Sequence, residues 1–110
     1  MPNPTQFTWT DPTTNTDGSP IVAGEITGYM IGIRSTTAAG SVAGTYPITA
    51  IVAGATAANE LISALGTVLK ADSYAAAIQT MGPVNSAFTA EIIFSIAALT
   101  PNPPANFSVS

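Results

Sequence analysis

Few side chains in this chain could bind a metal. The stretch from Asn15 to Gly18 has part of the pattern of a calcium-binding loop, in which alternating oxygen ligands precede a glycine. The first ligand position of such a loop would fall on Thr13 and the twelfth on Gly24, and neither residue supplies the carboxylate that the pattern needs. We therefore expect an ordinary polar turn here, and no metal ligands.

Catalytic groups are equally scarce. Asp11, Asp17 and Glu25 could gather at one end of a fold, but a general acid and base need neighbours that separate their pKa values, and no such pair is identifiable. Serine and threonine are plentiful, yet there is no histidine and no nucleophile elbow, and Lys70 has no group to act with. We predict no catalytic residues, no cofactor and no enzymatic activity.

The composition narrows the function classes further. The chain has no cysteine, which excludes disulfides and Cys/His zinc sites. Its two basic residues, Arg34 and Lys70, stand against six acidic ones, giving a net charge of −4. Because no cationic surface can neutralise a phosphate backbone, we expect no nucleic-acid partner. A surface with so few charges suits packing against other proteins.

Nothing in the sequence predicts insertion into a membrane. The apolar runs at residues 48–58 and 87–99 are interrupted by glycine and polar residues, and both are shorter than the roughly 18 to 20 residues that a spanning helix needs. The first residues contain no basic stretch followed by an apolar run, so we expect no signal peptide on the chain as given.

The hydrophobic pattern predicts strands that share one core. With 110 residues, 46% of them hydrophobic, the chain suffices for a single domain. Residues 5–10 alternate, with Phe7 and Trp9 on one face. Residues 26–35 alternate in the same way, with three apolar residues inward and the residues between them outward: inward Tyr29, Ile31 and Ile33, outward Gly28, Met30, Gly32 and Arg34.

The second half of the chain is read in the same way. Residues 45–52 read as a strand that contains Pro47, and proline lacks the ladder donor, so this strand is expected at a sheet edge. Residues 59–70 are ambiguous. Their apolar residues recur at helical spacing, but a strand followed by a turn is also consistent; these residues are Leu61, Ile62, Leu65, Val68 and Leu69. Two further strands are expected, one with Tyr74, Ala76 and Ile78 inward, and one over residues 86–96 with apolar candidates Phe88, Ile92, Phe94 and Ile96.

Three groups of landmarks, Phe7-Thr8-Trp9, Gly28-Tyr29-Met30-Ile31 and Leu69 to Tyr74, resemble those of a fibronectin type III domain over about residues 5–96. The resemblance implies an all-β, immunoglobulin-like sandwich of two antiparallel sheets, with strands B, C, E, F and G. It also implies a tyrosine corner, in which the Tyr74 hydroxyl bonds to a backbone group slightly upstream. The implied core is Phe7, Trp9, Tyr29, Ile31, Ile33, Leu69, Tyr74, Ile78 and Phe94.

The chain departs from this family at both ends. Only eight residues precede Trp9, too few for both an A and a B strand, so the A strand is expected to be missing. Residues 1–99 then form the sandwich and residues 100–110 a proline-rich tail. The tail is a candidate donor strand for an adjacent subunit, through Ala105, Asn106, Phe107, Ser108 and Val109. Ala97 to Pro104 spans about 25 Å when extended, marginal for the chain's own sheet. A disordered terminus and pairing with the chain's own sheet remain alternatives.

These features favour a non-enzymatic structural or assembly module. The leading expectation is a bacteriophage virion protein, a capsid decoration or tail-associated subunit, whose partners are other protein subunits of its own or another kind. The alternative is an adhesive or carbohydrate-binding module, or a spacer domain, of an extracellular bacterial protein. In that case the loops at residues 13–24 and 81–86 would form the contact surface, and the location would be extracellular or at the cell surface rather than in a virion.

Overall fold

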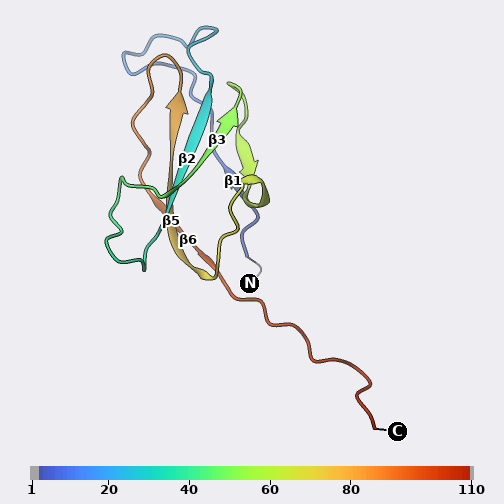
Figure 1. Ribbon diagram of the computed structural model, residues 1–110. Coiled ribbons are helices and arrows are strands. Elements are labelled where there is room, and N and C mark those ends of the chain that lie inside the picture. Colours follow the sequence, from blue (N-terminus) through green and yellow to red (C-terminus); the bar gives the residue numbers. More distant parts are fainter. Residues whose placement is uncertain (1–2, 110) are drawn as a thin grey trace.

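The computed structural model describes residues 3–109 and is built almost entirely of strands (Figure 1). The elements, in chain order, are β1 (Gln6–Thr8), β2 (Gly28–Ser35), β3 (Ile48–Ala53), β4 (Asn59–Leu61), the short 3-10 helix η1 (Ile62–Ala64), β5 (Asp72–Met81) and β6 (Ile92–Ile96). The fold class is therefore all-β.

The strands form two antiparallel sheets. One sheet has four strands in the order β3-β2-β5-β6, and the other pairs β1 with β4. In the larger sheet Gly28 lies opposite Met81 and Ser35 opposite Tyr74, so β2 and β5 pair along the whole length of β2. β3 is an edge strand, as expected for the segment around Pro47, although the strand begins one residue after the proline.

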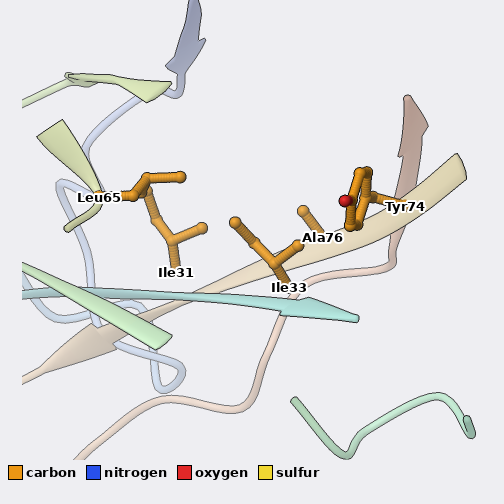
Figure 2. Close-up of a cluster of buried hydrophobic side chains, with 5 residues drawn as sticks. All are labelled: Ile31, Ile33, Leu65, Tyr74 and Ala76. Carbon is orange, nitrogen blue, oxygen red and sulfur yellow. The ribbon is translucent and has the colours of Figure 1, made fainter. Parts of the chain in front are cut away.

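The core lies between the two sheets. Figure 2 shows Ile31 and Ile33 of β2 beside Ala76 and Tyr74 of β5, with Leu65 reaching Ile31 from the turn after η1. Because side chains of a strand alternate between its faces, the spacing of Tyr29, Ile31 and Ile33 places all three on the inner face of β2. The remaining implied core residues, Phe7, Trp9, Leu69, Ile78 and Phe94, are partly buried and pack against this cluster.

The Tyr74 hydroxyl donates a hydrogen bond of 2.7 Å to the carbonyl of Lys70, four residues upstream. Its ring stacks on Phe94 with centroids 5.5 Å apart. The bond is of the kind that a tyrosine corner makes, and it fastens the turn that leads into β5.

Residues 59–70 form a short strand followed by a turn, the second of the two alternatives that their sequence allows, and not an α-helix. β4 takes three residues, η1 takes three more, and the segment then continues irregularly to β5. Leu65 is buried by the turn rather than by a helical stripe. The apolar residues at helical spacing therefore belong to a tight turn that covers the core, and not to an α-helix.

The last strand is shorter than the expected 86–96. Residues 86–91 follow β5 without a continuous ladder, although the amides of Ser86 and Thr89 donate to the carbonyls of Thr80 and Ile78, both at 2.9 Å. In the opposite direction the two side-chain hydroxyls take the place of backbone acceptors: Ser86 accepts from the Thr80 amide at 2.8 Å and Thr89 from the Ile78 amide at 3.2 Å. Regular pairing with β5 begins only at Ile92. Phe88 consequently packs on the outer face, against Tyr46.

The C-terminal residues leave the sandwich as an extended tail (Figure 1). Residues 97–109 form no strand and are exposed throughout. Hydrogen bonds among residues 3–109 reach Ala97 and go no further along the tail. The molecule is elongated for this reason, with extents of 75 × 31 × 21 Å.

Candidate interaction surface

The smaller sheet has an open edge along β1. The amide of Trp9 donates to Ala58 at 3.0 Å, the amide of Ile62 donates to Thr5 at 2.9 Å, and Phe7 lies opposite Glu60, so odd-numbered residues direct their backbone groups toward β4. In an antiparallel ladder the residues between them point the other way. Thr8 therefore presents its backbone N–H and C=O at an edge that pairs with no other strand within residues 3–109.

An apolar groove runs beside this edge. It has a volume of about 250 Å³ and lies between β1 and the inner faces of β5 and β6. Its lining includes Phe7 and Trp9 on one side and Ile78, Ala90 and Ile92 on the other. Ile92 shares the inward parity of Phe94 yet remains 57% exposed, because no other part of residues 3–109 covers it. We call this feature the β1 groove.

The five candidate donor residues lie at the end of the tail, away from the groove of their own chain (Figure 1). Phe107 is 95% exposed and Val109 98% exposed. The backbone at Asn106 has φ 60, a left-handed conformation that asparagine tolerates, so the segment is not extended throughout. The structure thus does not bring together the donor residues and the core residues Phe7 and Trp9.

Asn3 fastens the base of the tail to the start of β1. Its side-chain oxygen accepts from the Ala97 amide at 2.8 Å, and its side-chain nitrogen donates to the Ala97 carbonyl at 3.2 Å. The carboxamide thereby imitates one backbone pair of an antiparallel ladder. This contact fixes where the tail departs, and sequence reasoning did not predict it, since it joins residues 94 positions apart.

A polar cluster on the outer face of the larger sheet was also not predicted. The Arg34 guanidinium makes two bonds to Glu91, of 2.8 and 2.7 Å, and Tyr46 donates to the same carboxylate at 2.9 Å. The two charged side chains are only 14% and 16% exposed. Gly32 makes room for the Tyr46 ring, since a Cβ there would lie 2.5 Å from it.

The pKa directions follow from these contacts. The hydrogen bond from Arg34 lowers the pKa of Glu91, and hydrogen bonds from Ser35 and Thr37 lower the pKa of Asp72. Burial, together with the nearby Asp11 carboxylate, raises the pKa of Tyr29 to about 12. None of these groups lines the β1 groove, so the groove itself offers apolar contact and backbone hydrogen bonds rather than titratable chemistry.

The loops proposed for the alternative function lie next to each other. Residues from 12–26 and from 80–86 line a second hollow of about 360 Å³ at the end of the sandwich where β2 begins. Asp17 is engaged within its own turn, where it accepts from the amide and the hydroxyl of Ser19 at 2.9 and 2.6 Å. Over residues 3–109 no group of three or more acidic side chains is placed to hold a metal ion.

Comparisons of the chain with protein-family models, with curated proteins and with solved structures gave no match. Within the described part of the chain, no helix is long and apolar enough to cross a membrane.

Proposed function

We propose that this protein is a non-enzymatic assembly module that works through protein-protein contacts at the β1 groove. The single observation that supports this most is the uncovered edge of the sandwich, where a strand with free backbone groups borders apolar side chains. Such an edge invites pairing with another strand, and folded proteins normally cover or block it.

The finer fold assignment is part of the proposal. The order of β2, β5 and β6 in one sheet, with β1 and β4 paired in the other, is what strands C, F, G, B and E of a fibronectin type III sandwich would give, with β3 added beside C. The Tyr74–Lys70 bond supports the same assignment. An A strand would then lie beside β1, over the β1 groove.

The setting that we propose is a virion, where the chain would serve as a capsid decoration or tail-associated subunit. Its low charge and its exposed apolar tail suit permanent packing in a large assembly better than free diffusion. The alternative of an adhesive, carbohydrate-binding or spacer module keeps the hollow between the loops at residues 13–24 and 81–86 as its surface.

The test is whether the protein is a regular constituent of a particle. Particles purified by density gradient from a culture that expresses the gene in its natural context should contain the chain at a fixed ratio to the major shell or tail protein. A chain that stays with the soluble fraction, or that is found joined to a secreted multidomain protein, would overturn the virion assignment in favour of the alternative.

A further inference from the structure

The groove and the tail are complementary in chemistry. The groove offers the free backbone groups of Thr8 between two aromatic side chains, Phe7 and Trp9. The tail offers five consecutive residues without proline, directly after Pro104, in which Phe107 and Val109 alternate with polar residues. This is the pattern of a strand with one buried face.

We infer that residues 105–109 of one copy pair with β1 of a second copy and fill its β1 groove. This rests on the proposed function and deepens it by naming the partner as a second copy of the chain. Ala105, Phe107 and Val109 face inward, and Asn106 and Ser108 face outward beside Thr8. Asn106 must leave its left-handed conformation for an extended one on docking.

The direction of the strands decides between the chain's own groove and that of a neighbour. Phe7 contacts Phe94, which lies opposite Tyr74 and so level with Ser35 at the end of β2, whereas Trp9 contacts Tyr29 at the start of β2. β1 therefore runs opposite to β2, and also opposite to β6, because β2 and β6 both pair antiparallel with β5. A strand that pairs antiparallel with β1 must therefore run in the direction of β6. The tail already leaves in that direction (Figure 1).

For its own groove the tail would have to reverse twice. Asn3 holds Ala97 near the start of β1. To pair antiparallel with β1 of its own chain, the linker must first run alongside β1 as far as Trp9, about 20 Å at the rise of a strand, and then reverse its direction. Ala97 to Pro104 reaches about 25 Å when extended, which leaves almost nothing for two turns. A copy placed further along the tail receives the same strand without any reversal.

The resulting contact is head-to-tail. The tail end of one copy meets the Trp9 end of the next, so donor and acceptor surfaces differ, and repetition gives open chains or closed rings. The chain contains no cysteine, so single introduced cysteines can report the pairing without background.

The deciding experiment uses two full-length variants that each block one half of the contact. Thr8→Pro removes the N–H at the open edge but none of the bonds to β4, because Thr8 faces away from that strand; Thr8→Val is its matched control. Phe107→Asp with Val109→Asp blocks the donor, and Asn106→Thr, which favours extended backbone, is the control on that side. Circular dichroism and unfolding curves verify that each variant is folded.

We expect the unmodified chain to form concentration-dependent oligomers by light scattering, and both controls to do so as well. Each blocking variant alone should associate at least about tenfold more weakly. An equimolar mixture of the two blocking variants should give a discrete dimer, since one intact donor meets one intact acceptor. Monomers throughout, including the mixture, would overturn the inference.

Disulfide trapping tests the same pairing by position. Thr8→Cys on one chain should cross-link to Ser108→Cys or Asn106→Cys on another, and the control Leu99→Cys in the linker should not react comparably. A monomeric intrachain disulfide in the doubly substituted chain would show that the tail enters its own groove and would refute the inference. If the chain is found in particles but does not self-associate, the proposed function survives and only the choice of a second copy fails.

Discussion

At the scale of single residues, Gly32 determines what the outer face of the larger sheet can hold. It lies between two outward side chains of β2 and leaves a space that the Tyr46 ring fills. Tyr46 in turn donates to Glu91, which holds Arg34. The absence of one Cβ thus allows an aromatic ring and an ion pair to pack together, and the alternation pattern alone marks this position only as outward.

Gly32→Ala should therefore destabilise the protein by about 1–3 kcal/mol, as overpacking does. The new methyl group would lie 2.5 Å from the Tyr46 ring and 2.8 Å from its Cβ, so the whole side chain must move. Chemical denaturation measures the loss. Gly40→Ala is a comparison variant in which only the positive φ of the glycine is unfavourable for alanine, since no atom lies within 4 Å of a Cβ there. If adding Tyr46→Ala to Gly32→Ala costs as much as Tyr46→Ala alone in the parent chain, the clash is not the cause.

The three tyrosines should ionise at a higher pH in the folded protein than in the unfolded one. Burial raises the pKa of Tyr29 to about 12 and also raises the pKa values of Tyr46 and Tyr74. Because the folded pKa values lie above the unfolded ones, this contribution to stability is present below about pH 10 and is lost as the pH rises through the folded values. Absorbance at alkaline pH should show delayed ionisation in the native chain and ordinary ionisation in denaturant; coincident curves would contradict the burial.

At the scale of elements, the connection between β5 and β6 is held by side chains together with two backbone hydrogen bonds, rather than by a regular ladder. Ser86 and Thr89 satisfy amides of β5, and Glu91 reaches across to Arg34 before regular pairing starts at Ile92. This segment should therefore respond to acid more strongly than the strands do.

Acidification should loosen this connection and also the contacts of Asp72, the first residue of β5, with Ser35 and Thr37. The folded pKa values of Glu91 and Asp72 are lowered from ordinary values of 4.5 and 3.8, so the stability that they contribute is present above those values and is lost as the pH falls through the folded ones. The thermal midpoint should stay level above about pH 5 and fall as the pH decreases further, and Glu91→Gln should flatten that dependence. An equally steep dependence in the variant would exclude Glu91 as a cause.

The strands differ in how well the sequence predicts them. Tyr29, Ile31 and Ile33 predict β2 because a long strand with one buried face repeats its pattern several times. β4 has only three residues, too few to show a clear alternation of apolar and polar side chains. The apolar residues that follow it recur at helical spacing, so the pattern alone does not predict a strand there. The tail residues of the candidate surface are recognisable from their pattern. The β1 groove is not, since the approach of Ala90 and Ile92 to β1 depends on a register that no local pattern encodes.

At the scale of the whole molecule, the tail dominates the shape. The radius of gyration is 18.5 Å, whereas a compact chain of this length would have about 13 Å. Beyond Ala97 the tail makes no hydrogen bond to the rest of residues 3–109, so the body and the tail are two separable parts.

Truncation after Leu99 should thus leave the unfolding midpoint of the monomer unchanged, because residues 100–109 are exposed and make no hydrogen bond to the body. X-ray scattering at low concentration should show a clear decrease in the radius of gyration. Ile33→Ala is the contrasting variant: it should cost about 2–5 kcal/mol and leave the radius of gyration unchanged. A truncated chain that unfolds at a lower temperature would mean that the tail packs on its own sandwich.

The two hydrogen bonds between Asn3 and Ala97 also affect how the protein responds to a pulling force on its tail. Tension on the tail acts along β6, and the five residue pairs between β6 and β5 lie side by side across that direction. They must therefore yield together, in shear, rather than open one after another like a zipper. Because Asn3 passes part of the load to β1, both sheets share the force, and a pull on the tail is distributed across the full width of the protein.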